Sequence, residues 1–349
     1  MFAVLVAAGA IWGIGALMKT PKSVRWTMLS VLYLAVLLMQ AVFPTGHPLR
    51  DATGGSVAPW LLIGGIGFLV FAYRKGLQWL RSRAEGQADA LAEAPAKIGT
   101  FSDTELNRYA RHIVLREVGG PGQKKLKEAK VLVIGAGGIG SPALLYLAAA
   151  GVGTIGVVDD DEVDNSNLQR QVIHQDAGIG MPKVHSAAAA MRAQNPFVEV
   201  RPYNRRLIAD EAETLVADYD LVLDGTDNFD TRYLVNAACV ALGKPLISGA
   251  LTQWEGQVSV FDPAQDAPCY QCIFPEAPAP GLSPSCAEAG VIGPLPGVIG
   301  SIMAMEAVKI IANAGTVLRG EMLIYDGLYG ETRKIGLKRR ADCPCCGSK

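Results

Sequence analysis

The feature that most restricts the fold of this chain is the stretch VLVIGAGGIG at residues 131–140. Its apolar start predicts a buried strand, and the glycine-rich turn after it predicts a connection into a helix. Gly135, Gly137 and Gly140 have the spacing G-x-G-x-x-G, in which glycine permits a tight turn, close approach of the backbone to phosphate and close packing of helix on strand. The N-terminus of the helix then offers N–H donors to an anion. The stretch therefore predicts that the phosphates of a nucleotide lie against this turn.

Strands and helices alternate along most of the chain after residue 130. Strands are expected at 130–135, 154–159, 198–204, 220–225 and 245–250, and helices at about 138–150, 182–194, 209–217 and 228–242. This alternation predicts an α/β fold in which helices cover both faces of a mainly parallel sheet. Residues 252–262, TQWEGQVSVFD, alternate apolar and polar side chains and predict an antiparallel strand beyond the parallel core. Residues 102–119 are expected to be helical, with a capping box of Ser102 and Glu105.

Polar residues gather where the predicted strands end, which is the edge of such a sheet that binds ligands. Asp159 ends the second strand and is placed to accept hydrogen bonds from a ribose hydroxyl. The turn and this carboxylate alone favour a NAD-dependent oxidoreductase. The other polar residues at these ends are Asn167, Arg170 and Gln171 in SNLQRQ, Lys183 in GMPKV, and Asp224 and Asp227 in LVLDGTDN.

The charges in this set fit a different reaction. Two cations, Arg170 and Lys183, could reach the β and γ phosphates of ATP, and a carboxylate of the DGTDN segment could hold Mg²⁺. Attack on the α-phosphate of ATP needs such groups because negative charge develops on the leaving pyrophosphate. Hydride transfer does not need them. The sequence therefore favours ATP and Mg²⁺ over a nicotinamide cofactor.

Seven cysteines are spread unevenly along the chain. Cys269 and Cys272 form one C-x-x-C pair and Cys343 and Cys346 a second, and together they could close a tetrahedral Zn²⁺ site that ties the end of the chain to the domain. Cys345 would then be a spare thiol. Two further cysteines stand alone: Cys286 in a proline-rich stretch expected to be a loop, and Cys239 in a helical segment expected to be buried.

The first part of the chain predicts a membrane module. Three runs without charged side chains, residues 2–18, 26–43 and 57–73, each approach the length that crosses a bilayer. Lys19, Lys22 and Arg25 lie between the first two runs, and more cations follow the third, so the positive-inside rule places the N-terminus outside and the remainder in the cytoplasm. The alternative is a cleaved signal peptide followed by buried core helices.

These features divide the chain into a membrane module at residues 1–75 with three transmembrane helices, a linker at 76–100, and a catalytic domain at 101–349. A hydrophobic fraction of 50% agrees with contact with lipid, and a net charge of -1 argues against binding to nucleic acid.

The ordered motifs of residues 102–347 resemble those of a known family. NRYARHIVL, GAGGIGSP, SNLQRQVIH, GMPKV, DGTDN, GALTQWEGQVSVF, CYQC, CAEAGV and DCPCC follow one another as in the prokaryotic ubiquitin-like activating enzymes, the MoeB, ThiF and HesA group, and are most similar to the MoeB type. The resemblance implies a Rossmann-like ATP-binding domain with a structural zinc site, which acts as a homodimer.

It also implies roles for single residues. Gly138 would lie against the phosphates, Asp159 would hold the ribose, and Asp227 would bind Mg²⁺. Arg170 and Lys183 would contact the triphosphate, with Asn167 and Gln171 nearby. Arg111 would act as an arginine finger in the partner subunit's site. Cys286 matches a cysteine that in relatives can bind the carrier protein covalently, although adenylation alone can suffice in the MoeB type.

The implied reaction is ATP-dependent adenylation of the C-terminal glycine of a ubiquitin-like sulfur carrier that ends in Gly-Gly, with release of pyrophosphate. A MoaD-like carrier, the small subunit of molybdopterin synthase, would place the enzyme in molybdenum cofactor biosynthesis. The alternatives are the same chemistry on a ThiS-like thiamin carrier, a NAD-dependent oxidoreductase, and a membrane-tethered scaffold. The expected location is the inner, cytoplasmic membrane.

Overall fold

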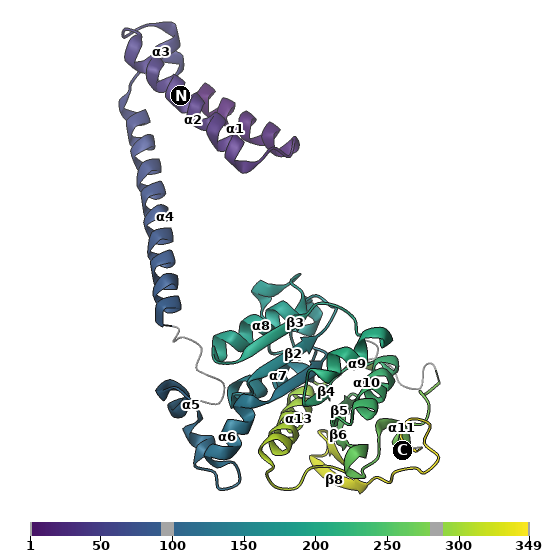
Figure 1. The fold of residues 1–349 in the computed structure, drawn as a ribbon. Coiled ribbons are helices and arrows are strands. Elements are labelled where there is room, and N and C mark those ends of the chain that lie inside the picture. The colour runs from purple at the N-terminus through teal and green to yellow at the C-terminus, as the bar shows by residue number, and fades with distance from the viewer. Residues whose placement is uncertain (1, 92–100, 280–288, 348–349) are drawn as a thin grey trace. The chain divides into compact units, whose positions relative to one another are not determined.

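The computed structural model describes residues 2–91, 101–279 and 289–347. The chain forms two compact units, residues 1–94 and 95–349, and the division falls inside the segment expected to be a linker. Figure 1 labels the elements of both units.

The N-terminal unit consists of α1 (Phe2–Leu17), α2 (Lys22–Val42), α3 (Pro48–Ala52) and α4 (Ala58–Leu91). Its small core contains Val4, Val36 and Trp60. The hydroxyl of Tyr33 on α2 donates a hydrogen bond of 2.7 Å to the carbonyl oxygen of Trp60 on α4. Because α4 continues to Leu91, helix occupies most of the expected linker.

Two of the three expected spans lie in helices that are long and apolar enough to cross a bilayer, α2 and residues 58–77 of α4. The first, α1, has 16 residues, which at about 1.5 Å per residue is short of the roughly 30 Å hydrocarbon core. A helix of similar length and apolarity, α13 (Pro294–Ala312), belongs to the other unit, where half of its apolar window is buried. Length and composition alone therefore do not separate a span from a core helix.

The C-terminal unit is built on an eight-stranded sheet with the order β3-β2-β1-β4-β5-β6-β7-β8. The strands are β1 (Lys130–Ile134), β2 (Thr154–Val158), β3 (Glu199–Tyr203), β4 (Leu221–Asp224), β5 (Leu246–Leu251), β6 (Glu255–Phe261), β7 (Glu321–Asp326) and β8 (Glu331–Gly336). The first five pair in parallel, and β6, β7 and β8 extend the sheet in antiparallel fashion. The expected parallel core and its extension by antiparallel strands are confirmed; the sequence located β6 among these strands but not β7 or β8.

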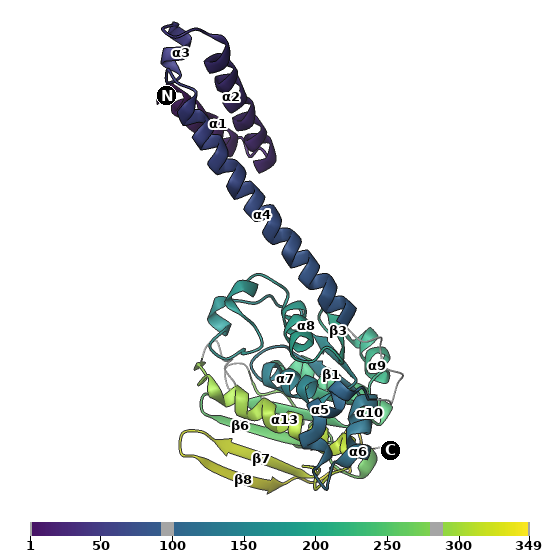
Figure 2. The ribbon, with the colours of Figure 1, turned by 90° about the vertical axis from the view of Figure 1, so that its left-hand side faces the viewer.

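Helices cover both faces of this sheet, as Figure 2 shows. Side chains of β1 alternate, so that Val131 and Val133 belong to one core and Leu132 and Ile134 to the other. Most helical side chains of the first core come from α7 (Gly140–Ala150), α8 (Lys183–Gln194) and α13, and most of those of the second from α9 (Ala209–Ala217) and α10 (Phe229–Leu242). The short helix α11 (Tyr270–Ile273) follows β6.

The helix expected at residues 102–119 is two helices. The first, α5 (Asp103–Ile113), begins at the expected capping box, in which the Ser102 hydroxyl accepts the N–H of Glu105 and the Glu105 carboxylate accepts the N–H of Ser102. The second, α6 (Gly119–Glu128), starts at a glycine with φ of +59°, a backbone conformation that a residue with a side chain rarely adopts. The single-helix prediction was therefore wrong at its C-terminal end.

Candidate active site

The site lies at the topological switch point of the sheet, where the order of the strands reverses beside β1. The strand β1 has β2 on one side and β4 on the other, and ligands of doubly wound sheets bind beyond the carboxyl ends of such strands. A cleft of about 790 Å³ is present at this position. The expected site residues that line it are Gly135, Gly137, Gly138, Asp159, Arg170, Gln171, Lys183 and Asp227.

The glycine turn after β1 has the geometry that its spacing predicts. Gly135 has φ of +93°. A Cβ atom on Gly140 would lie 1.9 Å from the carbonyl oxygen of Gly135, so the turn can close only when this residue is glycine. A Cβ atom on Gly138 would lie 3.1 Å from Pro296, at the start of α13. The backbone of the glycines in this turn therefore lines the cleft directly, because these residues have no side chains to cover it.

Asp159 is fixed by backbone N–H groups from two loops. Its Oδ2 accepts the N–H of Ala136 in the glycine turn at 2.7 Å, and its Oδ1 accepts the N–H of Asp161 at 2.9 Å. Burial raises the pKa of this carboxyl above its ordinary value, and the Ala136 N–H and the Lys183 charge oppose that rise. The carboxylate is thus held at the cleft, where a ribose hydroxyl could also donate to it.

The two expected cations occupy different surroundings. The side chain of Lys183, at the start of α8, is 5% exposed, and its Nζ lies 2.7 Å from Asp161 Oδ2. Arg170 donates through Nη2 to Asn167 Oδ1 at 2.7 Å. Asn167 is not among the residues that line the cleft, and its side chain contacts the site through this hydrogen bond to Arg170.

Two polar oxygens in or beside the cleft have no hydrogen-bond partner in the part of the chain that the structure describes, Gln171 Oε1 and Asp224 Oδ2. Gln171 lines the cleft and is buried. Because an unpaired buried polar atom is costly, an unpaired oxygen on a residue that lines the cleft fits a site that holds a polar ligand.

Asp227 is exposed in the loop after β4 and lines the cleft, and within the described ranges its carboxylate makes no hydrogen bond or ion pair. One free carboxylate beside a cleft that could hold nucleotide phosphates fits the way in which proteins bind Mg²⁺ together with such phosphates. The loop itself is anchored by Asp224, whose Oδ1 accepts the N–H and the hydroxyl of Thr226.

Several residues at the site were not expected from the sequence. Arg205 and Arg206, in the segment after β3, and Arg232, on α10, line the cleft. Arg232 is buried and donates to the carbonyl oxygens of Thr226 and Gly249, so it ties the Asp227 loop to β5. His174 lies beside the glycine turn, with Nε2 2.9 Å from the carbonyl oxygen of Ala136, and burial lowers its pKa. Such contacts depend on packing and leave no spacing motif in the sequence.

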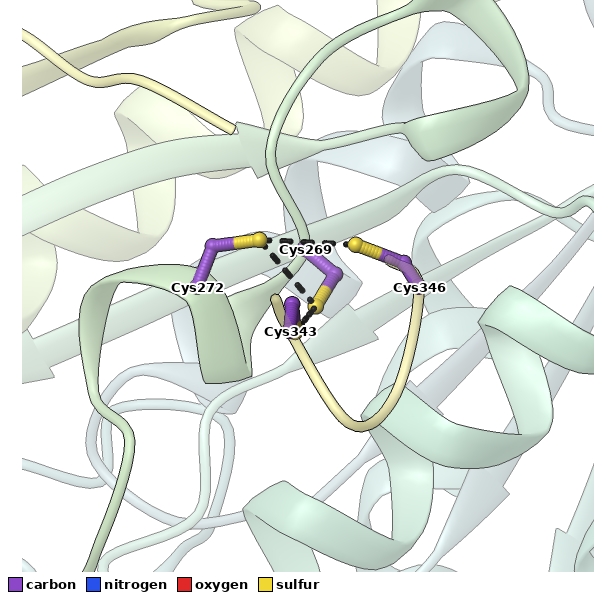
Figure 3. Close-up of side chains that lie close together, drawn as sticks. All are labelled: Cys269, Cys272, Cys343 and Cys346. Carbon is purple, nitrogen blue, oxygen red and sulfur yellow. Dashed lines mark hydrogen bonds between the residues drawn. The ribbon is translucent and has the colours of Figure 1, made fainter. Parts of the chain in front are cut away.

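A second site lies beside α11, where four thiols meet (Figure 3). The Sγ atoms of Cys269, Cys272, Cys343 and Cys346 all lie within 4.8 Å of one another and their residues are buried. The separations are 3.8 Å for Cys269 to Cys272, 3.6 Å for Cys269 to Cys343 and 3.4 Å for Cys272 to Cys346. Tetrahedral Zn²⁺ with Zn–S distances of about 2.3 Å requires S···S separations of about 3.8 Å. The expected set of four cysteines is confirmed as a cluster that fits zinc.

Cys345 is not in this cluster and accepts a hydrogen bond from Asn236 Nδ2 at 3.3 Å. Cys239 is 2% exposed, as expected for a packing residue. Cys286 lies outside the described residues.

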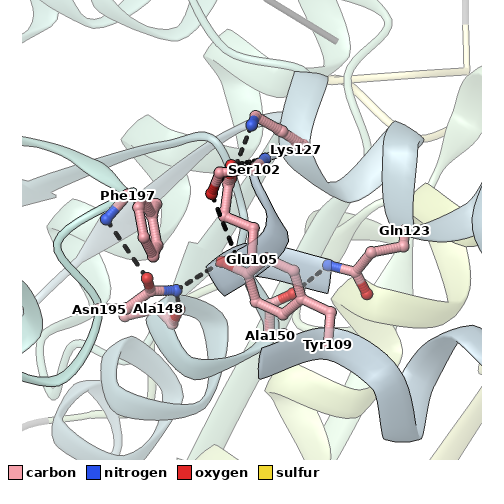
Figure 4. Close-up of polar contacts among 9 residues, drawn as sticks. All are labelled: Ser102, Glu105, Tyr109, Gln123, Lys127, Ala148, Ala150, Asn195 and Phe197. Carbon is pink, nitrogen blue, oxygen red and sulfur yellow. Dashed lines mark hydrogen bonds and ion pairs between the residues drawn. The ribbon is translucent and has the colours of Figure 1, made fainter. Parts of the chain in front are cut away.

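Arg111 is exposed on α5, is not among the residues that line the cleft, and has no polar partner within the described ranges. Its helix is firmly attached to the domain by the contacts in Figure 4. Lys127 on α6 pairs with the buried Glu105 at 2.6 Å, and Asn195 donates to the hydroxyl of Tyr109 at 2.8 Å. The guanidinium is therefore exposed on a helix that is fixed to the domain, and it does not line the cleft.

Comparison with known proteins gives consistent results. Residues 109–345 match the ThiF family. A sulfur carrier protein adenylyltransferase of Thermus thermophilus is 50% identical over 253 residues, which covers 71% of this chain and 93% of the relative. The SAMP-activating enzyme E1 of Haloferax volcanii is 49% identical over 244 residues, which covers 70% of this chain and 90% of the relative. The crystal structure of E. coli MccB with ATP shares the fold, with a TM-score of 0.61, 23% identity, and coverage of 69% of this chain and 75% of that chain.

Proposed function

The chain belongs to the ThiF family and is an adenylyltransferase, and on this premise we propose that it adenylates the C-terminal glycine of a ubiquitin-like sulfur carrier. The observation that carries the proposal is the convergence of the glycine turn, Asp159, Arg170, Lys183 and Asp227 on one cleft. The relatives' names support a sulfur carrier as the substrate class, since one of them is a sulfur carrier protein adenylyltransferase.

In the proposed reaction the terminal carboxylate of the carrier attacks the α-phosphorus of ATP. A new O–P bond forms, the bond from the α-phosphorus to the bridging oxygen breaks, and pyrophosphate leaves with that electron pair. The carboxylate is ionised at neutral pH, so no general base is needed. Catalysis then consists of positioning the reactants and neutralising charge.

The cleft residues would have different roles in this reaction. The N–H groups of the glycine turn and the start of α7 face the phosphates, and the Asp159 carboxylate accepts a ribose hydroxyl. Lys183 and Arg170 place positive charge where the pyrophosphate develops. Asp227 would hold Mg²⁺, which supplies further positive charge to the phosphates. An adenylyltransferase uses the turn for ATP, so the NAD-dependent alternative is not retained.

The carrier that we favour is the MoaD-like small subunit of molybdopterin synthase, which rests on the resemblance of the motifs to the MoeB type. The ThiS-like thiamin carrier is the second candidate. Both would present a C-terminal Gly-Gly tail to the cleft.

Two further parts of the proposal concern assembly. The four-cysteine cluster would bind structural Zn²⁺ and fix the C-terminal segment. A second copy of the chain would supply Arg111 to the cleft as an arginine finger, because Arg111 is exposed on a rigid helix and does not line its own cleft.

The N-terminal unit would anchor the enzyme in the inner membrane, with the N-terminus outside and the catalytic unit in the cytoplasm. Only 11% of the apolar window of α2 and 6% of that of α4 are buried, which suits helices that lie in lipid. Lys19, Lys22 and Arg25 lie around the turn between α1 and α2, and Arg74 and Lys75 lie on the later part of α4. These cations would face the cytoplasm.

ATP-pyrophosphate exchange tests the proposal. The full chain, purified in detergent with Mg²⁺, is assayed with the MoaD-like carrier and, separately, with the ThiS-like carrier. Exchange that depends on the first carrier is the expected result. Exchange with the second alone would keep the chemistry and change the pathway, and no exchange with either carrier would contradict the proposed substrate class.

A further inference from the structure

Lys183 depends more on a partner for its orientation than Arg170 does. Lysine carries a compact charge on a flexible four-carbon chain, whereas the planar guanidinium of arginine is oriented by several donors at once. Arg170 is in addition held by the side chain of Asn167 and the carbonyl oxygen of Ser166. For Lys183, the described part of the chain offers one side-chain partner, Asp161.

Asp161 contacts Lys183 at two points. Its carboxylate Oδ2 accepts Lys183 Nζ at 2.7 Å, and its carbonyl oxygen accepts the backbone N–H of Lys183 at 2.9 Å. The neighbouring residues continue this pairing, since the N–H of Val163 donates to the carbonyl oxygen of Met181 at 2.9 Å. The loop after β2 is thus paired with the segment that leads into α8, and the start of α8 is fixed to that loop.

Asp161 also contacts the carboxylate that is proposed to bind ribose. Its N–H donates to Asp159 Oδ1 at 2.9 Å, and Asp159 Oδ2 in turn accepts the N–H of Ala136 in the glycine turn at 2.7 Å. A continuous series of polar contacts therefore runs from the turn through Asp159 and Asp161 to the ammonium of Lys183. The parts that would hold phosphate, ribose and leaving group are set relative to one another by this series.

From these contacts we propose that Asp161 is a positioning residue, which fixes the Lys183 ammonium for contact with the triphosphate. This inference rests on the proposed function. An ammonium group has three N–H donors, so Lys183 can keep its bond to Asp161 and still donate to phosphate oxygens. The side chain of Asp161 is 66% exposed, so it serves as an orienting group at the rim of the cleft and does not itself need to be buried.

The chain offers a matched control next to this residue. Asp160 is also an exposed aspartate that lines the cleft, but it makes no hydrogen bond or ion pair within the described ranges. Asp160→Asn and Asp161→Asn remove the same charge from adjacent positions of one loop. A general effect of net charge near the cleft would therefore appear in both variants, and an effect of positioning only in the second.

The test measures exchange kinetics of the full chain in detergent, MgATP affinity by calorimetry without carrier, and the unfolding temperature. Asp161→Asn is expected to lower kcat/KM for ATP about tenfold or more, the size of effect that a hydrogen bond between charged groups has. Asp160→Asn, which removes the same charge but no contact with Lys183, is expected to lose clearly less than Asp161→Asn. Asp161→Glu, which retains the charge, is expected to restore part of the loss.

A purely structural effect is separated by a double-mutant cycle on MgATP affinity. In the Lys183→Ala background, Asp161→Asn should cause no further loss, since the ammonium that it orients is absent. Equal losses in both backgrounds, equal behaviour of the Asp160 and Asp161 variants, or tighter ATP binding by Asp161→Asn would each overturn the inference. If the wild type shows no exchange with any carrier, the proposed function fails, and the affinity cycle still tests the role of Asp161.

Discussion

Replacing one ligand of the four-cysteine cluster should release the metal and loosen the C-terminal end of the catalytic unit. Cys343→Ser removes one of the four thiols, and Cys345→Ser removes the neighbouring thiol that the cluster does not include. The first variant is expected to lose bound zinc, because a structural site needs all four ligands. The second is expected to retain it.

The expected change in stability follows from the length of chain that the cluster closes. Cys269 and Cys343 are 74 residues apart, and a cross-link over a loop of that length contributes about 4 kcal/mol in the chain-entropy description. For a unit of this size, each kcal/mol corresponds to a shift of about 2–4 °C in the unfolding temperature. The Cys343→Ser variant should therefore unfold about 10 °C below the wild type.

The assay is the zinc content of the purified full chain by elemental analysis, together with thermal unfolding followed by circular dichroism. Addition of a strong chelator to the wild type should reproduce the Cys343→Ser result. Full zinc content in the Cys343→Ser variant, or loss of zinc in the Cys345→Ser variant, would refute the assignment of the ligands. An unchanged unfolding temperature after zinc has been lost would refute the stabilisation assigned to closing the loop between Cys269 and Cys343.

Three other predictions concern the nucleotide cleft. Asp227→Ala should abolish pyrophosphate exchange and leave carrier binding largely intact, and near-normal exchange would remove this residue from the mechanism. Gly140→Ala should cost about 3 kcal/mol or more, because its Cβ atom would lie 1.9 Å from the Gly135 oxygen, whereas Gly297→Ala, with no atom within 4 Å, should be tolerated. His174 has a pKa below the ordinary 6.5, so the unfolded state binds its proton more tightly and stability falls as pH drops through 6.5. Unfolding temperatures between about pH 8 and about pH 5.5 should therefore fall less in His174→Gln than in the wild type, and equal slopes would contradict this.

The fold of the parallel core could be predicted because its signals are local. The apolar run of β1 ends in a glycine-rich turn, and the helical pattern of residues 209–217 matches α9 residue for residue. By contrast, β8 is exposed along its whole length and is held by backbone pairing with β7, so its sequence, ETRKIG, has no buried face to reveal it. The apolar helix α13 was also not expected, and its composition resembles that of a membrane span.

The candidate site was likewise predictable from the sequence only in part. Asp159, Lys183 and Asp227 could be found because each follows a strand or begins a helix at a recognisable position. The partners that orient them could not, because a contact such as that of Asp161 with Lys183 joins residues 22 positions apart and forms only when the loop and the helix pack. Arg232 likewise reaches the Asp227 loop from α10 through backbone carbonyl oxygens, which any sequence would provide.

The central claim is that the carboxylate at the end of the carrier attacks the α-phosphate of ATP. The most direct measurement is intact-mass analysis of the MoaD-like carrier after incubation with the full chain, MgATP and pyrophosphatase, beside a carrier that lacks its last glycine. The account predicts an adenylate on the complete carrier and none on the shortened one. No adduct on the complete carrier while ATP is consumed, or an adduct on both carriers, would contradict it.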